Sequence, residues 1–533
     1  MSYLVSHRRS ARHISPLGRE QKDYMDFLRF PRRTVCHVSQ SGIETKSCMN
    51  FLPIPRRTVS VALSLMLSAC AVGPDYVQAP PLEIGSNYKA TQLRDWQQVS
   101  VPDDLRYKDW WLRFQDEQLN QLMQELNSSN LRIAQALAQF EAAVAGARGA
   151  RANLFPSLGT NANLSRAGGS AQDPTTTYTA SGTLSWEVDL WGRVRRQVES
   201  GHYNAQAAAA DLADMRLSMQ AQLAKDYFSL RMTDEQIALL GRIVQAYERS
   251  VRMNQNRYEQ GVAARADVVS ATAQLENARA QAINIRAQRQ QLESSIAVLL
   301  GRAPVNFSLP AQAFSVQVPA VPTVLPSSLL VRRPDIASAE RRVASANADI
   351  GVAQAAWLPS LNLSANGGLR HSNFADWLSS PLNFWSLGPQ LALAIFDGGA
   401  RQASVDTSKA QYRAQVANYR QTVLTALKEV EDSMTLVSVL AEQQAVQARA
   451  LGAARESLTI TRNQYQAGLI DYLSVTQVEN TAYNTEITAL QLMSQRLNAA
   501  VDLLMALGGG WEVPGTSPYS VVSSAASEVP TAQ

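Results

Sequence analysis

No group of residues in this 533-residue chain combines the types and the spacing of a catalytic site. Beyond residue 69, only His202 and His371 remain of the five histidines. No stretch has the spacing of a zinc-protease helix, a serine-hydrolase elbow or a phosphate-binding loop, and no Cys, His, Asp or Glu cluster has metal-ligand spacing. The sequence therefore predicts a protein that is not an enzyme and that uses no metal or cofactor.

One thiol does have a chemical signature, the side chain of Cys70. Two arginines precede an apolar run at 59–67 that is too short to cross a bilayer, a pattern typical of a signal peptide. The run ends in "LSAC", which resembles the bacterial lipobox, in which the cysteine is acylated and begins the mature chain. Cys70 is thus predicted to attach lipid, with an ordinary cleaved signal as the alternative. Ala71, rather than Asp, fits delivery to the outer membrane.

Charge and cysteine content change once this signal is removed. Residues 1–48 hold nine Lys/Arg against four Asp/Glu and are interpreted as a mis-assigned upstream extension or an unstructured leader, with the signal peptide at 49–69. The formal charge of +4 becomes −3 for residues 70–533, so no basic patch indicates nucleic acid. Cys36 and Cys48 are lost as well, and the mature chain can form no internal disulfide.

The mature chain contains an internal repeat. The segment "IAQALAQFEAAVAGARGARANLFPSL" from Ile133 resembles "IASAERRVASANADIGVAQAAWLPSL" from Ile336, and the offset stays between 203 and 207 down to the "LG" pairs at Gly301 and Gly508. Five prolines separate the copies. The predicted organisation is a lipid-anchored linker, a first repeat, a proline-rich linker, a second repeat and a tail, at 70–115, 116–301, 302–333, 334–510 and 511–533.

Two segments of each copy change from helical periodicity to alternation. In "YTASGTLSWEVDL" the residues at 178–190 alternate between apolar or small and polar, which predicts a strand with one apolar and one polar face. Residues 385–395 alternate less strictly, and shorter alternations follow Pro156 and Pro359. Strands of roughly ten residues suit a tilted strand of an outer-membrane barrel, although any one of them could be the edge of a sandwich.

Four strands are too few to close a barrel, because the smallest closed barrels need about eight and an open edge is not tolerated in lipid. If these strands span a membrane, several chains must share one barrel. Two chains would give eight strands and a filled interior, and three would give twelve strands and a lumen. The rest is predicted to be helical, with long helices starting at Arg193 and Arg401 and a coiled-coil-like spacing from Leu490 to Leu504.

Several motifs together resemble those of a known family, the outer-membrane factors of bacterial tripartite efflux pumps, of TolC/OprM type and especially the NodT-like lipoprotein branch. The motifs are "CAVGPDY", "WEVDLWGRVR", "RRPDIASAE", "FDGGARQ" and "ALGGGW", in this order between residues 70 and 511. The resemblance implies an α+β membrane protein: a homotrimer whose twelve shared strands form one barrel, continued by a long α-helical barrel across the periplasm. It also implies a periplasmic membrane-fusion adaptor and an inner-membrane transporter as partners.

Other motif residues have a structural interpretation. Gly192, Gly398 and Gly399 permit unusual backbone where a strand joins a helix, and Asp189 and Asp397 could accept hydrogen bonds from the first amides of the following helix.

Two glycine turns break long helices and resemble the periplasmic tip of the family, where the adaptor docks. The predicted adaptor contacts are Gly261, Val262, Ala263, Gly468, Leu469 and Ile470. The resemblance also places a closed gate at the second turn, with Leu473 at the constriction. Some members of the family have an acid where this chain has Gln477, so Asp471 or Asp267 would have to supply any carboxylate there.

The expected function is therefore a passive outer-membrane channel that exports small toxic compounds and is gated at its periplasmic tip. Two alternatives remain open at this point. A periplasmic coiled-coil lipoprotein without a pore would share the anchor and the helices but leaves the four strands unexplained. A duct for type I protein secretion would share the whole architecture and differ only in what it carries.

Overall fold

The computed structural model describes residues 71–77, 88–89, 109–170, 172–312, 314, 318–319, 333–379 and 382–509. All of them belong to one compact unit, Met66–Gln533. The predicted signal peptide, Cys70, the tail at 511–533 and most of the linker at 302–333 lie outside the described residues.

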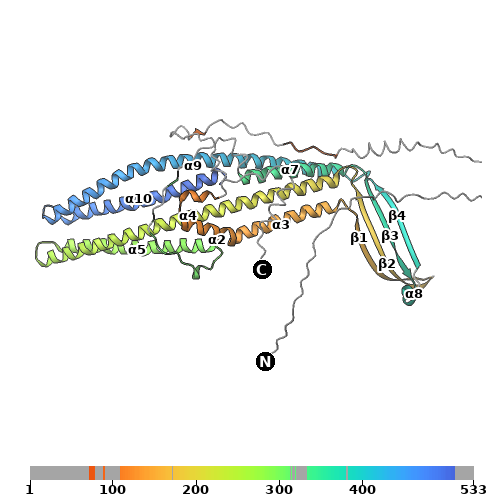
Figure 1. Ribbon diagram of the computed structural model, residues 1–533, viewed down its shortest axis with the longest axis horizontal. Helices are drawn as coiled ribbons and strands as arrows, with labels where there is room; N and C mark the ends of the chain where they lie inside the picture. The colour runs from red at the N-terminus through yellow and green to blue at the C-terminus, as the bar shows by residue number, and fades with distance from the viewer. Residues whose placement is uncertain are drawn as a thin grey trace, which may run out of the picture. The chain divides into compact units, whose positions relative to one another are not determined.

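The repeat is visible as two similar sets of helices, α3 with α4 and α5, and α7 with α9 and α10 (Figure 1). In the first copy α3 (Leu131–Ala152), α4 (Arg193–Glu259) and α5 (Arg265–Leu299) have 22, 67 and 35 residues. The second copy has the same lengths in α7, α9 and α10, which are Pro334–Ala355, Ala400–Gln466 and Tyr472–Ala506. The offset is 203 between the starts of α3 and α7 and 207 between the starts of α4 and α9, so the four additional residues lie in the strand region.

Each long helix lies beside two shorter ones that meet end to end. Where α5 ends and α3 begins, the Asn130 side chain donates to the carbonyl oxygen of Leu299 and accepts from the first amides of α3. Arg333 has the same place in the second copy, where it precedes α7 and donates to the carbonyl oxygen of Ala506 at the end of α10. These polar residues satisfy backbone groups that a helix end would leave unpaired.

The four strands form one antiparallel sheet in the order β1-β2-β3-β4, so β1 and β4 are its edges. Their bounds are Ser157–Gly169, Gln172–Val188, Ser360–His371 and Leu382–Ala392. The fourth strand begins and ends three residues earlier than the alternation at 385–395 predicts. The cause is the ladder: β3 begins at Ser360, which pairs with Ala392, so the residues after 392 have no partner strand.

One face of the sheet is apolar and the other polar, as the alternation predicts. Residues that pair across the strands fall in rows, such as Leu158, Leu184, Ala365 and Leu387. The adjacent row, on the opposite face, consists of Gly159, Thr183, Asn366 and Ser386. The apolar face is left uncovered along β4, where Trp385, Leu387 and Leu391 are exposed. Within the described residues, these side chains of β4 therefore have no apolar partner that buries them.

The main hydrophobic core lies around the middle of α4, where α5, α10 and two short elements surround it. The short elements are the 3₁₀ helix η3 (Trp110–Phe114) and α2 (Glu117–Ser129). Phe228 of α4 packs against Phe114, and Leu497 and Leu504 of the predicted coiled-coil stripe are buried in the same cluster. Within the described residues, no helix is both long and apolar enough to span a bilayer. The remaining short helices are η4 (Pro304–Asn306) and α8 (Phe374–Ser379).

Candidate functional site

The joints between strand and helix are built alike in both repeats. Asp189 accepts hydrogen bonds from the backbone amides of Val194 and Arg195, at 3.0 Å each. Asp397 likewise accepts from the amides of Gly399 and Arg401, at 3.0 and 3.1 Å. These carboxylates occupy the positive end of each long helix, where an anion is stabilised.

Glycines supply the backbone conformation that these joints need. Gly192 has φ +81°, and Gly398 and Gly399 have φ +63° and +93°. Such angles are strained for residues with a Cβ. The chain therefore turns from strand to helix within a few residues in both repeats.

The segment directly after Cys70 is held against the first joint, a contact that the sequence reading missed. The amide of Val72 donates to the carbonyl oxygen of Trp191 at 3.0 Å. The buried side chain of Arg196 pairs with Asp75 at 2.6 Å, and Asn347 donates to the carbonyl oxygen of Pro74 at 2.9 Å. The motif "CAVGPDY" thus contains a docking segment as well as the predicted lipid site.

The two glycine turns join the helices of each hairpin at the end far from the sheet (Figure 1). Gly261 and Gly468 both have φ +75°, and both are exposed. Val262 and Leu469 follow them and are also exposed. Ala263 and Ile470 are half-buried, and Ile470 packs against a cluster with Tyr465 and Tyr472. Among the six predicted adaptor contacts, the structure therefore leaves the first two residues of each turn accessible.

Contacts near the turns connect the two hairpins. The Tyr465 hydroxyl of α9 donates to the side chain of Asn254 in α4 at 2.6 Å. The Arg257 guanidinium lies 4.7 Å from the centre of the Tyr465 ring, which permits a cation–π interaction. The two tips are therefore held beside each other within one chain.

The residues predicted for the gate lie on one exposed side of the start of α10. Leu473 is 59% exposed, and Gln477 is exposed one helical turn further on. Asp471 caps α10 by accepting from the amide and the hydroxyl of Ser474, and these hydrogen bonds lower the pKa of its carboxyl. Asp267, by contrast, is half-buried in the first turn of α5. Among the described residues, Leu473 belongs to no hydrophobic cluster of this chain.

A buried carboxylate lies two turns deeper in the same hairpin. Glu479 is almost fully buried in α10 and accepts from Arg462 of α9 at 2.8 Å, and Arg462 also donates to the Tyr483 hydroxyl. Burial raises the pKa of Glu479, while Arg462 opposes the shift. The sequence reading did not identify this pair, because neither residue belongs to a recognised motif.

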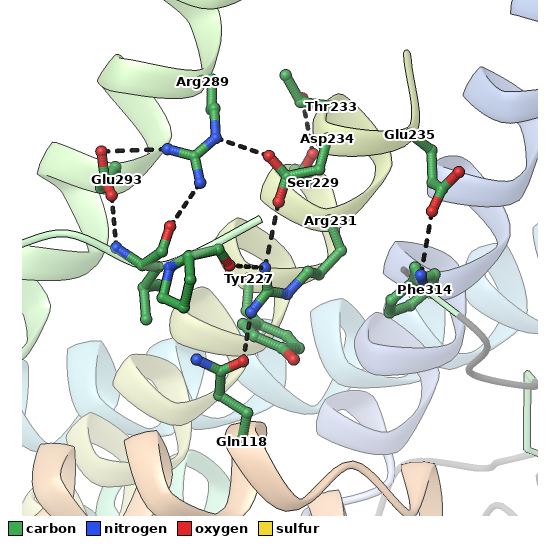
Figure 2. A network of polar contacts seen from close by, with 12 residues as sticks. Gln118, Tyr227, Ser229, Arg231, Thr233, Asp234, Glu235, Arg289, Glu293 and Phe314 are labelled. Carbon is green, nitrogen blue, oxygen red and sulfur yellow. Dashed lines mark hydrogen bonds and ion pairs between the residues drawn. The ribbon is translucent and has the colours of Figure 1, made fainter. Parts of the chain in front are cut away.

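A second network of charges lies at the middle of the helices, where the linker leaves α5 (Figure 2). The fully buried Arg231 of α4 donates to the carbonyl oxygen of Pro310 and pairs with Asp234. Arg289 of α5 also pairs with Asp234, and it donates to the carbonyl oxygen of Leu309 at 2.6 Å. Because every partner belongs to this chain, the network anchors the start of the linker to both helices.

Metal-binding geometry does not occur in the part of the chain that is described: no group of three or more His, Cys, Asp or Glu side chains could hold an ion there. The features that recur in both repeats are instead the joints and the tips. The joints connect the strands to the long helices, and the tips connect the two helices of each hairpin.

Comparisons with known proteins agree with this architecture. The family model described as "Outer membrane efflux protein" matches residues 122–302 and 325–509. The antibiotic efflux pump outer membrane protein ArpC of Pseudomonas putida is 30% identical over 467 residues, which cover 84% of this chain and 94% of ArpC. The cation efflux system protein CusC of Escherichia coli is 27% identical, over 84% of this chain and 98% of CusC.

Solved structures give the same result. The open state of the MtrE outer membrane channel of Neisseria gonorrhoeae superposes with a TM-score of 0.74 at 28% identity, over 83% of this chain and 99% of MtrE. The family consists of transport proteins, so this chain is not an enzyme. Its two repeats, its four strands and its paired helical hairpins are those of an efflux channel subunit. The chain belongs to the outer membrane efflux protein family.

Proposed function

We propose that this chain forms the outer-membrane channel of a tripartite efflux pump, as a homotrimer that is anchored by lipid at Cys70 and reaches into the periplasm. The channel is a passive conduit, because energy would come from an inner-membrane transporter joined to it by a periplasmic adaptor.

The sheet is the observation that carries this proposal. It has one apolar face and two free edges, and an edge with unpaired backbone groups is not tolerated in lipid. Strands β1 and β4 run in opposite directions, so β4 of one copy can pair with β1 of the next and keep the antiparallel order. Three copies give twelve strands, which leaves room for a lumen, whereas eight strands are filled by side chains.

The helices support the same assembly. At ~1.5 Å per residue, α4 and α9 each extend roughly 100 Å, which suits a tunnel that leads away from the membrane. Helix α9 carries apolar side chains that are half or more exposed in the single chain, and a neighbouring copy would cover them. They are Leu424, Val439, Val446 and Ile460.

The tips would serve the adaptor and the gate. Gly261, Val262, Gly468 and Leu469 are exposed at the ends of the hairpins, with Ala263 and Ile470 behind them. Leu473 from three copies would form an apolar constriction, and such a constriction closes a pore by excluding water. Asp471 from each copy would add a ring of negative charge close to it.

The cargo we propose is small toxic compounds. Relatives of this chain are named for the export of antibiotics, toluene, cations and pyoverdine, all of which are small. A duct for secreted proteins is the remaining alternative, whereas a coiled-coil lipoprotein without a pore does not account for the sheet.

Two measurements test the proposal. Protein extracted in detergent should have the mass of three chains and should conduct ions in planar bilayers. Deletion of the gene should increase sensitivity to antibiotics and dyes, and the intact gene should restore resistance. A monomer without conductance would contradict the channel, and unchanged susceptibility with the loss of one secreted protein would favour the secretion duct.

A further inference from the structure

A cavity of about 600 Å³ lies at the joint where β2 ends and α4 begins. Its walls come from the ends of β2, α7 and β4, and polar and apolar atoms contribute to them about equally. The apolar members include Val188, Leu190, Trp191, Leu358, Leu393 and Ala394. Pockets of this volume commonly hold small ligands.

The charged groups of the cavity are already paired. Glu187 forms a salt bridge with Arg193, and Asp189 accepts from the amides of Val194 and Arg195. No carboxylate in the wall is therefore left to attract a cation. The chemistry that fits is an uncharged chain, and the apolar face of the sheet continues into the cavity through Val188, which pairs with Leu361.

Ala71, which follows the predicted acylation site, lies against the joint that lines this cavity. Val72 donates its amide to the carbonyl oxygen of Trp191, which lines the cavity. A Cβ placed on Gly192 would lie 2.8 Å from the Cβ of Ala71, so the backbone at 71 touches the joint. Cys70 precedes Ala71, and consecutive Cα atoms are about 3.8 Å apart.

The segment that follows is fixed at several points, so residue 71 cannot move far from the joint. Arg196 donates to Asp75, Asn347 donates to the carbonyl oxygen of Pro74, and Tyr76 donates to Glu340. Gly73 packs so closely on Gly351 that neither position has room for a side chain. The lipid on Cys70 is thus attached to an immobilised segment and not to a free tether.

We propose that the cavity at the joint binds an acyl chain of the lipid carried by Cys70. This assignment rests on the lipidation of Cys70 in the proposed function, and it adds a binding site for the lipid. The acyl chain lies between the end of the sheet and the start of α4, where it fills the space beside Trp191. The lipid then stabilises the joint in addition to holding the protein in the membrane.

Photo-crosslinking tests this directly with the full-length protein. Cells would be fed a fatty acid that carries a diazirine and an alkyne, membranes would be illuminated, and the purified protein would be digested for mass spectrometry. The acyl group on Cys70 should crosslink to the peptides around 187–193 and 392–394. Intact mass in the same sample reports whether Cys70 carries lipid.

A matched pair of variants adds a control. Ala356→Trp adds bulk at the wall of the cavity and should reduce these crosslinks several-fold. Asn153→Trp changes the corresponding position of the first repeat, at an offset of 203, and should leave them unchanged. If Ala356→Trp does not fold, the crosslinks of the unaltered protein still show whether the acyl chain lies at the cavity.

The outcomes separate the two proposals. Lipid on Cys70 with crosslinks only to phospholipid or to other peptides would overturn the cavity assignment and leave the anchor intact. Absence of lipid on Cys70 would remove both the anchor and the assignment. Crosslinks to the joint that Ala356→Trp does not weaken would place the chain outside the cavity and also overturn it.

Discussion

Gly73 and Gly351 pack backbone against backbone: a Cβ on Gly73 would lie only 2.4 Å from the Cα of Gly351. A Cβ on Gly351 would in turn lie 3.0 Å from both the Cγ of Arg196 and the carbonyl oxygen of Val72. The contact joins the segment after Cys70 to α7, close to the point where the sheet begins. Glycine at both positions is what allows this approach.

Substitution of Gly351 should therefore release the segment. We expect Gly351→Ala to cost about 1–3 kcal/mol through overpacking and to increase hydrogen exchange at 72–77. Gly149→Ala is the control, because nothing lies within 4 Å of its Cβ position in α3, and alanine favours a helix by up to ~1 kcal/mol. Equal exchange in both variants would show that the close contact is dispensable.

Leu473→Ser should increase ion leakage through the channel. The leucine is exposed in the single chain, so its loss removes no packing there, and a hydroxyl at an apolar constriction favours wetting. Single-channel conductance in planar bilayers measures the effect. Ala266→Ser, at the corresponding position of the first turn, should have little effect, and unchanged leakage for Leu473→Ser in a folded assembly would exclude this residue from the gate.

Arg462→Ala should destabilise the second hairpin more than Glu479→Gln does. Removal of the arginine leaves a buried carboxylate without its cation, and because the side chain of Arg462 is 39% exposed we expect a cost of about 1–3 kcal/mol rather than the full cost of a broken buried pair. The double variant Arg462→Ala/Glu479→Gln should recover most of the stability that Arg462→Ala loses.

The same pair has a pH signature. Burial raises the pKa of Glu479 above its value in the unfolded chain, so the folded state binds more protons. The free energy of unfolding therefore falls as pH rises from the unfolded pKa through the folded pKa. Without Arg462 the pKa should rise further, and Arg462→Ala should lose more stability at pH 8 than at pH 5. Thermal midpoints that fall equally at both values would contradict this account.

Asp214 should destabilise the fold at neutral pH. Burial, and after it the nearby Asp335, raises the pKa of Asp214 to about 6 from 3.8. A raised carboxyl pKa means that stability decreases as pH rises from about 4 to about 6. Asp214→Asn should therefore raise the thermal midpoint at pH 7, by the equivalent of about 1–2 kcal/mol, and should give little gain at pH 4.

Asp211→Asn provides the contrast to that substitution. Asp211 pairs with Arg342 and accepts from Ser338, whereas burial dominates at Asp214 and the nearby Arg333 offsets only part of it. We expect its removal to lower the midpoint at pH 7. A gain of stability from both substitutions would point to general repulsion among the acids rather than to the burial of Asp214.

Much of the fold could be predicted from the sequence because it depends on periodicity and repetition. The change to alternation at 178–190 predicts β2, and the offset of 203 to 207 predicts that α3 and α7 have the same role. The predicted end of β4 was wrong by three residues, because the apolar alternation continues to Ile395 although β3 offers no partner beyond Ala392. Pairing, and not composition, sets where a strand ends.

Contacts between distant segments could not be predicted in this way. Arg462 meets Glu479 because the Gly468 turn brings α9 and α10 together in one particular register. Nothing in the local sequence of Val72 or Asp75 indicates that Val72 donates to the carbonyl oxygen of Trp191 or that Asp75 pairs with Arg196. Such contacts depend on how complete helices lie side by side, which neither segment specifies alone.

The equal lengths of the helices in the two repeats limit how this protein can change in evolution. One residue inserted in the middle of α4 would rotate everything beyond it by about 100° and move its tip by ~1.5 Å relative to that of α9. Insertions or deletions in these helices should survive only in whole sets of turns, introduced together in both helices of a hairpin and in both repeats. The strand region, which already differs by four residues between the copies, is free of that restriction.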